Sequence, residues 1–321
     1  MRIVTFDAGT ATDVEWAEVH GLFAAQLAAV APAEPVPTVR ELRREYDVAP
    51  SVRPSNWAVR DASGEMVGFA RLAVRDGKDT GYLHALLVTP DHRRAGLGRR
   101  LLALAAERAR AGGCRNLVGW TADPAGREFL AAVGARVAGG FRKSVARLPV
   151  TAPPRRVPAG YRLLTWTGPA PADRLDSYAR AREAINDAPH DPDEAPDRYT
   201  PERIREMEAT LARRGQHLRV TVALDGAGTV VGFTGLYVSP EPGSAVATGD
   251  AAVLPEHRGR GLIAAVKYES LRLLAADRPD VTEVTTGNDV GNAPMLAVNA
   301  RLGFVETVTW TQALLDLPGS P

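Results

Sequence analysis

Two six-residue stretches, "RRAGLG" at Arg93–Gly98 and "RGRGLI" at Arg258–Ile263, carry the clearest structural signal in this sequence. Each follows an apolar run that ends in Pro, an acidic residue and His, and each opens an apolar segment with helical spacing. Glycines between a strand and a helix let backbone N–H groups converge on one point, and the start of the helix adds a partial positive charge. Both stretches therefore predict an anion-binding loop, and a pyrophosphate is the ligand that we expect there.

The two loops could have other roles. Their glycine spacing differs from the dinucleotide pattern G-x-G-x-x-G, and the Lys-Ser/Thr pair of the P-loop ATPases is missing, so neither class is favoured. A tight strand-to-helix turn also uses glycine for its conformation alone, which is the structural alternative for each loop taken singly. The presence of two copies, each flanked by Arg, favours a binding site.

The chain repeats itself around the two loops. Asp61–Val74 ("DASGEMVGFARLAV") reappears as Asp225–Val238 ("DGAGTVVGFTGLYV") 164 residues later, and the two loops lie 165 residues apart. A steady offset over different elements indicates a duplication. The Pro-rich stretch between the copies cannot continue a helix or a central strand. We therefore expect two domains, 1–150 and 161–321, joined by a linker at 151–160.

The order of elements predicts the fold class. Each copy reads as strand, helical region, antiparallel hairpin, strand, glycine loop, helix, strand, short helix and strand. This order predicts an α+β fold, in which a mixed, mostly antiparallel sheet is flanked by helices. The length of 321 residues suits two such domains.

Composition and charge exclude several classes of protein. The net charge of +1 and the absence of a Lys/Arg block argue against a nucleic-acid partner. No signal pattern and no apolar run of about 20 residues is present, so we expect a cytoplasmic protein without membrane contact. The single cysteine, Cys114, excludes an intramolecular disulfide and a multi-cysteine metal site, and we expect no metal. We expect a monomer or a homodimer.

The loops resemble a known family. The segments "VTPDHRRAGLGRRLL" and "VLPEHRGRGLIAAVK" resemble the acetyl-CoA loop of the GCN5-related N-acetyltransferases (GNAT), whose pattern is R/Q-x-x-G-x-G/A after a strand valine. The first copy matches fully, whereas the second has Ile263 where Gly or Ala is usual. "TTGNDVGNAPMLAVNARLGF" is similar to the later family motif, with Asn292 at the asparagine that leads its helix. The resemblance covers nearly the whole chain and implies two tandem GNAT domains, an arrangement also found in mycothiol-synthase-like enzymes.

The resemblance implies acetyl-CoA as the cofactor and assigns a set of residues to it. In the first copy these residues are Val88, Arg93, Arg94, Ala95, Gly96, Gly98 and Arg99. In the second copy they are Val253, Arg258, Gly259, Arg260, Gly261, Ile263 and Asn292.

The resemblance also implies that an amine attacks the thioester directly, without an acyl-enzyme. A base must then remove a proton from an ammonium group with a pKa of ~10. His84 in "GYLHALLV" is similar to the histidine that assists deprotonation in serotonin N-acetyltransferase, and an imidazole pKa of ~6.5 suits this task. Asp250 in "ATGDAAVL" is the candidate in the second copy. The alternatives are a half-buried strand histidine and an edge carboxylate.

His84 and Asp250 are not simple equivalents. His84 lies nine positions before Arg93, whereas Asp250 lies eight before Arg258, so in regular strands the two side chains point to opposite faces. Only a β-bulge would bring them into register. On the thiolate side, Asn299 stands where many family members have a tyrosine, and it could hydrogen-bond the sulfur.

The helical region before each hairpin lines the acceptor site in such domains. In the second copy this region contains an acidic stretch, 186–199, which would attract a cationic amine, although a solvated loop is the alternative. The residues that we assign to the substrate are Asp187, His190, Asp191 and Tyr199.

The sequence thus predicts an acetyl-CoA-dependent N-acetyltransferase that acts on the primary amine of a small molecule, in biosynthetic tailoring or self-resistance. We expect the second half to carry the chemistry, and the first to bind CoA more tightly because Ile263 crowds the second loop. The alternatives are a non-catalytic CoA-binding protein with degenerate GNAT domains and a protein-lysine acetyltransferase. Arg-rich, Lys-poor composition indicates a bacterial source.

Overall fold

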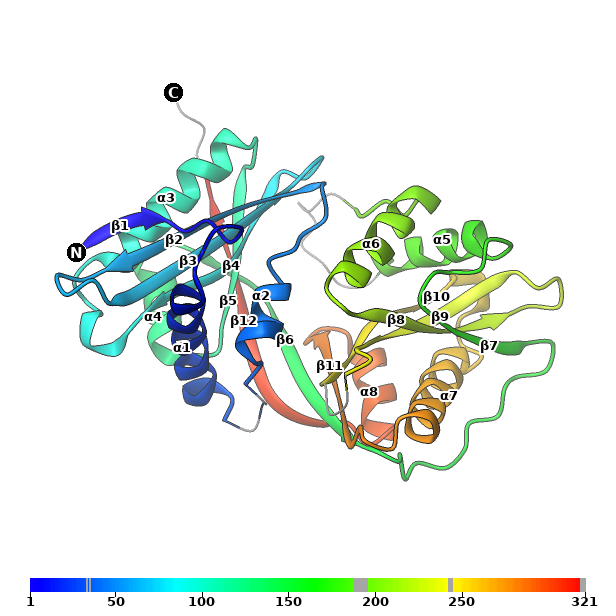
Figure 1. Ribbon diagram of the computed structural model, residues 1–321. Helices are drawn as coiled ribbons and strands as arrows, with labels where there is room; N and C mark the ends of the chain where they lie inside the picture. Colours follow the sequence, from blue (N-terminus) through cyan, green and yellow to red (C-terminus); the bar gives the residue numbers. More distant parts are fainter. Residues whose placement is uncertain (33, 35, 188–195, 242–244, 318–321) are drawn as a thin grey trace. The chain divides into compact units, whose positions relative to one another are not determined.

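Two units, each built on six β-strands with helices on both faces, organise the chain (Figure 1). The computed structural model describes residues 1–32, 34, 36–187, 196–241 and 245–317. Unit 1 contains residues 1–140 and 308–317, and unit 2 contains residues 141–187 and 196–307 of this described chain. The α+β class expected from the sequence is confirmed.

Unit 1 contains one parallel pair of strands, β4 and β5, in an otherwise antiparallel sheet. In sheet order its strands are β1 (Arg2–Thr5), β2 (Val52–Arg60), β3 (Met66–Arg75), β4 (Thr80–Val88), β5 (Asn116–Thr121) and β12 (Val305–Asp316). Its helices are α1 (Asp13–Val30), α2 (Val39–Arg44), α3 (Leu97–Ala111) and α4 (Pro124–Ala132).

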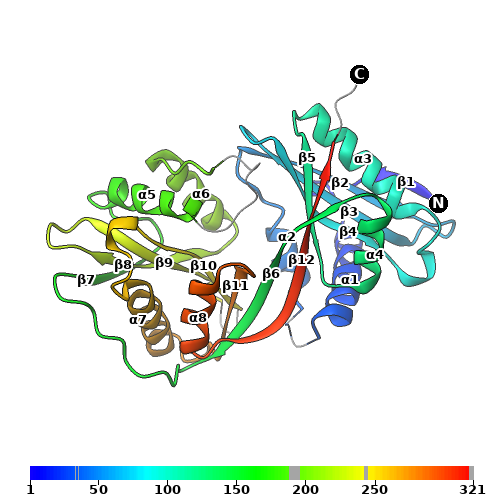
Figure 2. The same cartoon turned by 180° about the vertical axis from the view of Figure 1, so that it is seen from behind.

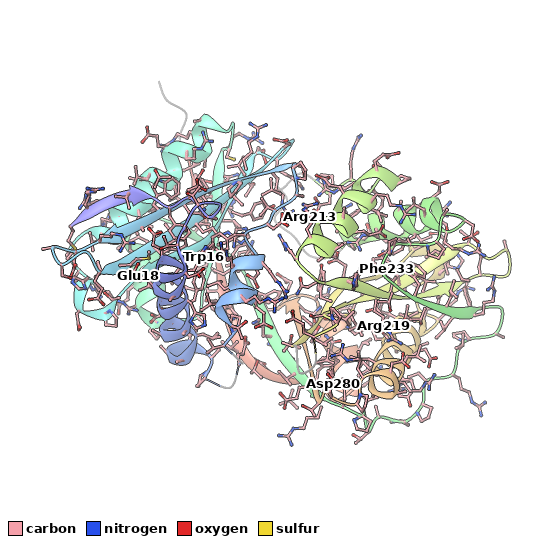
Figure 3. The ribbon with its side chains drawn as sticks, viewed as in Figure 1. Trp16, Glu18, Arg213, Arg219, Phe233 and Asp280 are labelled. Atoms are coloured by element: carbon pink, nitrogen blue, oxygen red, sulfur yellow. The ribbon has the colours of Figure 1, made fainter. Side chains whose placement is uncertain are left out.

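The core of unit 1 forms on both faces of its sheet. Trp16 of α1 is fully buried and meets the rings of Phe6 and Tyr46 edge-on, with centroids 5.3 and 4.8 Å away (Figure 3). This aromatic cluster lies on the face that α1 and α2 cover. Helix α3 packs through Leu101 and Ala105 on the other face. Leu97 and Leu101 of α3 are thereby removed from water, which stabilises the pairing of helix and sheet.

Unit 2 repeats this arrangement, and Figures 1 and 2 show α5 and α6 on one face of its sheet and α7 and α8 on the other. In sheet order its strands are β6 (Arg136–Arg147), β11 (Glu283–Asp289), β10 (Val246–Val253), β9 (Val230–Val238), β8 (His217–Leu224) and β7 (Arg162–Thr167). Its helices are α5 (Leu175–Glu183), α6 (Pro201–Arg213), α7 (Leu262–Asp277) and α8 (Ala293–Arg301). In its core the ring of Tyr178 of α5 meets that of Phe233 of β9 edge-on, with centroids 5.4 Å apart (Figure 3 labels Phe233).

The last strand of each sequence copy completes the sheet of the other unit. β6 ends the first copy but pairs with β11, from Phe141 opposite Asp289 to Arg147 opposite Glu283. β12 ends the second copy but pairs with β5. The units therefore differ from the boundaries 1–150 and 161–321, which follow the sequence repeat. Residues 148–161 form neither helix nor strand.

Two further features bear on the class of the protein. Cys114 is buried, and burial together with the charge of Asp79 raises the pKa of its thiol, so it behaves as a small apolar residue. Among the helices that the structure describes, none combines the length and the apolar character that a membrane span needs.

Candidate active site

In each unit the two parallel strands separate just before the glycine loop. β4 and β5 pair from Thr80 opposite Asn116 to Leu83 opposite Gly119, and β4 then runs on to Val88 without further pairing to β5. β10 and β11 pair only at two positions, and β10 likewise runs on to the second loop. We call each separation a fork. Backbone groups of β4 and β10 beyond the fork have no partner on the neighbouring parallel strand, so they can bind a ligand.

A β-bulge lies at the mouth of each fork. In unit 1, Arg71 of β3 is opposite Ala85 and the next residue of β3 is opposite Leu83, so His84 is the extra residue of β4. In unit 2, Gly249 and Asp250 together are opposite the single residue between Thr234 and Leu236. At the 165-residue offset of the loops, His84 corresponds to Gly249 and Ala85 to Asp250. The bulge is present in both copies. His84 and Asp250 therefore occupy adjacent positions of the repeat, not the same position.

The two glycine loops have the same backbone conformation. Gly96 and Gly261 precede α3 and α7 in the left-handed region, with φ of 77° and 79°. Two positions earlier, Arg94 and Gly259 have φ of 63° and 74°. Neither helix has a side-chain cap, so the N–H groups of its first turn lack a side-chain acceptor. Successive N–H groups in such a turn form an anion-binding concavity, and both loops can bind a phosphate group.

The first arginine of each loop fixes the loop to the strand before it. Arg93 Nε donates to the carbonyl oxygen of Val88 at 3.2 Å, and Arg258 Nε donates to that of Val253 at 2.9 Å. Arg258 also pairs with the carboxylate of Asp187, which follows α5. Apart from Asn292, the predicted cofactor residues of each copy thus lie between the end of one strand and the start of the next helix, with Ala95 exposed in the first loop.

Helix α4 covers the first loop. Arg94 pairs with the carboxylate of Glu128, and Arg99 Nη2 donates to the carbonyl oxygen of Ala132 at 2.7 Å. A Cβ atom on Gly98 would lie 3.1 Å from the ring of Phe129, so the close approach of α4 by itself favours glycine there.

The second loop differs at two of the predicted positions. Ile263, which corresponds to Gly98, packs against the hydrophobic cluster of unit 2 and so has a structural role that the sequence did not predict. Arg260 donates to the hydroxyl of Tyr161 at 3.0 Å and to the carbonyl of Glu256 at 3.4 Å.

His84 lies on the α1–α2 face of unit 1 at the mouth of its fork. Its ring stacks on that of Tyr82, with centroids 6.4 Å apart and an angle of 22° between the rings. Although the imidazole keeps contact with solvent, the surrounding protein and the charges of Arg71 and Arg75 lower the pKa of His84 to about 4. The ring is therefore unprotonated near neutral pH, and it is a weaker base than a free imidazole.

Asp250 has a charged partner. Arg182 of α5 is only 3% exposed, and its Nη2 donates to the carboxylate of Asp250, while its Nη1 donates to the hydroxyl of Tyr178 at 3.1 Å. The guanidinium also lies over the ring of Tyr199, 4.5 Å from the centroid. Burial raises the pKa of both tyrosines, so their hydroxyls stay protonated. This network binds Asp250 firmly to α5.

The remaining predicted residues of unit 2 have structural contacts. Asn299 is 3% exposed, and its Nδ2 donates to Asn288 Oδ1 at 2.6 Å, which ties α8 to β11. Asn292 caps α8 by accepting a hydrogen bond from the N–H of Met295 at 3.2 Å. Of the predicted substrate residues, Asp187 and Tyr199 lie near Arg258 and Arg182, respectively, as described above. His190 and Asp191 lie outside the described residues.

The sequence missed two buried arginines, Arg71 and Arg182, that lie at the two forks. Arg71 interrupts the apolar run "VGFARLAV" of β3, which is a visible signal of a special charge. Arg182 lies in the helix "LDSYARARE", where polar residues are frequent, so no pattern distinguishes it.

The comparisons with known proteins agree with this geometry. The model of the acetyltransferase (GNAT) family matches residues 16–134 and 180–304, and the chain belongs to this family. A tandem GNAT protein from the clavulanic acid biosynthesis pathway, solved without AcCoA, is 27% identical, with 100% of this chain and 99% of that chain covered and a TM-score of 0.81. The arrangement of two tandem GNAT domains is thereby confirmed.

More distant structures share the fold. A GCN5-related N-acetyltransferase from Sphaerobacter thermophilus is 18% identical, with 99% of this chain and 97% of that chain covered and a TM-score of 0.75. A putative acetyltransferase from Pyrococcus horikoshii is 13% identical, with 99% and 90% covered and a TM-score of 0.61. No curated protein matches the sequence.

Proposed function

We propose that this protein is an acetyl-CoA-dependent N-acetyltransferase that acts on the primary amine of a small molecule. The observation that carries the proposal is the shared geometry of the two forks, in which separated parallel strands lead into a left-handed glycine loop and an uncapped helix. The loop offers N–H donors for a pyrophosphate, and the free backbone of β4 and β10 can polarise a thioester carbonyl. Acetyl-CoA supplies the activated acetyl group.

We place the chemistry in unit 1, with His84 as the base. The sequence favoured Asp250 in the second half, but the Asp250 carboxylate is already bound by Arg182. His84 forms no ion pair among the described residues and, since burial and the charges of Arg71 and Arg75 lower its pKa to about 4, it is unprotonated near neutral pH. It therefore accepts the proton that the attacking amine loses, while the strand N–H groups stabilise the negative charge that develops on the thioester oxygen. The CoA thiolate that leaves unit 1 takes its proton from solvent. Asn299, which the sequence analysis assigned to the sulfur, lies in unit 2 and is 3% exposed.

The relative from the clavulanic acid pathway supports a small-molecule substrate. It is a tandem GNAT protein of a biosynthetic pathway, and both chains are covered almost completely by the comparison. A role in biosynthetic tailoring is consistent with that relationship.

A CoA-release assay tests the proposal. Full-length protein is incubated with acetyl-CoA, a thiol reagent and a panel of amino sugars, aminophosphonates, amino acids and polyamines. We expect at least one amine to accelerate CoA release and to appear as its N-acetyl product by mass spectrometry. If calorimetry shows that acetyl-CoA binds but no amine accelerates its cleavage, the non-catalytic alternative is correct.

A further inference from the structure

Arg71 of β3 brings a buried positive charge to the face of unit 1 on which His84 lies. The residue is only 9% exposed, and its Nη2 donates to the carbonyl oxygen of Glu45 at 2.9 Å. Its guanidinium carbon lies 3.8 Å from the centroid of the Tyr46 ring. Across the sheet, Arg71 is opposite Ala85, the neighbour of His84 in the bulge. The guanidinium thus comes from a residue that pairs with β4 just beyond the point where β4 and β5 separate.

The polar groups of this pair are incompletely satisfied. Nε of Arg71 and the hydroxyl of Tyr46 are both buried and have no hydrogen-bond partner in the described chain. Among the residues that the structure describes, no carboxylate forms an ion pair with Arg71. A buried guanidinium without a counter-ion and an unpaired buried donor both cost free energy. Burial raises the pKa of Tyr46 to about 12, so its hydroxyl remains a donor.

Unit 2 shows how the same fork neutralises a buried arginine. There the guanidinium of Arg182 enters from α5, lies over Tyr199, and is paired by the carboxylate of Asp250. Asp250 occupies the position that corresponds to Ala85 in unit 1. Unit 1 therefore also has a buried arginine and a tyrosine at its fork, although they come from β3 and from the segment after α2, but it has a methyl group where unit 2 has the carboxylate.

We propose that the acceptor substrate supplies this missing carboxylate, so that unit 1 acetylates a molecule of the amino acid class, in which an amine and a carboxylate lie close together. The carboxylate accepts hydrogen bonds from the Arg71 guanidinium, whose residue is 9% exposed, which suits the preference of guanidinium for carboxylate oxygens. His84 is adjacent to Ala85 in the bulge. An amine close to the bound carboxylate then lies on the face of the sheet that carries His84. The inference rests on the proposed function and names its substrate class.

A binding experiment without turnover provides the first test. The probes are N-acetyl amino acids of several side-chain types and the matched N-acetyl amino acid amides, titrated into the full-length protein by calorimetry. We expect the acids to bind at least about tenfold more tightly than their amides, as for one charge-assisted bond. Arg71→Gln should remove this difference, and Arg71→Lys should keep part of it. Equal binding of acids and amides to the wild-type protein would overturn the proposal.

Two variants, each of which gives one unit the residue that the other unit has at the corresponding position, provide a second test. Ala85→Asp supplies to Arg71 the carboxylate that unit 2 already has, so it should abolish the preference for acids while acetyl-CoA binding persists. Asp250→Ala frees Arg182 and should create a second site that binds the acids. If Ala85→Asp keeps the wild-type preference for acids, Arg71 is not the group that binds them. If Ala85→Asp fails to fold, the comparison of acids with amides still decides the question.

The outcomes separate this inference from the proposed function. If the acids bind through Arg71 but no amine releases CoA, the proposed function fails and the carboxylate site stands. If amines without a carboxylate prove the better substrates for CoA release, the carboxylate inference fails and the N-acetyltransferase stands.

Discussion

The buried guanidinium of Arg182 on α5 binds the carboxylate of Asp250 on β10, one of the two residues that form the bulge of unit 2. Asp250→Asn leaves this guanidinium without a counter-ion. We expect the free energy of unfolding to fall by about 2 kcal/mol, less than for a fully buried pair because the Asp250 side chain is 40% exposed. Chemical denaturation measures this change. Amine-dependent CoA release should stay within a few-fold of the wild-type rate.

A matched control for Asp250→Asn is Asp76→Asn. Asp76 pairs with Arg53 at the surface, where 48% and 64% of the two side chains are exposed, so its loss should cost under about 1 kcal/mol. The sequence-based assignment of Asp250 as the base predicts the reverse pattern. A loss of about 10²-fold or more in kcat for Asp250→Asn, with stability unchanged, would return the chemistry to unit 2.

His84→Ala should lower kcat on the best amine by about 10²-fold, which is the usual contribution of a positioned base. Because the pKa of His84 is lowered to about 4, the imidazole is unprotonated over the whole neutral range. The profile of kcat/KM against pH should therefore fall on its acidic side near pH 4 to 5 and show no step near pH 6.5. His84→Gln, which keeps a polar side chain but no base, serves as the control. Wild-type activity in that variant would exclude proton transfer by His84.

The glycines before α3 and α7 give a test of both CoA loops. Gly96→Ala and Gly261→Ala each place a side chain at φ near 77° and 79°, which costs about 1 to 2 kcal/mol and shifts the N–H groups that follow. We expect two acetyl-CoA sites per chain in the wild-type protein and one in each variant, measured by calorimetry. Gly113→Ala is the matched control, since Gly113 has φ of 84° and equal space but lies at the far end of α3. Two intact sites in both loop variants would refute the anion-binding role.

The repeat, the fold class and the two loops follow from the sequence because each depends on local patterns of glycine, proline and apolar residues. The exchange of β6 and β12 does not, because an apolar strand pattern indicates which face is buried but not which sheet the strand joins. The position of the Asp250 side chain could not be predicted from the sequence for a similar reason. Its register depended on a bulge, and its partner Arg182 comes from a helix about 70 residues earlier in the chain. Contacts between distant elements therefore decided the site.

Lys267 of α7 carries a buried charge that the proposed chemistry does not use. It is 3% exposed, its Nζ lies 5.7 Å from the centroid of the Phe304 ring, and burial lowers its pKa to about 8. The unfolded chain, in which the pKa of lysine is near 10.5, then binds the proton more strongly than the folded chain does. Stability should therefore rise as pH increases from about 8 to 10.5, and below pH 8 the buried charge should cost the folded state free energy.

Lys267→Met removes this charge and keeps the length of the side chain. We expect the free energy of unfolding at pH 7 to rise, by at most about 3 kcal/mol, and the rise of stability between pH 8 and 10 to disappear. Urea unfolding at pH 7 and pH 9.5 measures both effects. Lys78→Met, at a partly exposed position, should change stability by no more than about 0.5 kcal/mol. A lower stability of Lys267→Met at pH 7 would show that the Phe304 ring compensates the burial of the ammonium group, since a cation over an aromatic face gains up to about 2 kcal/mol when it is desolvated.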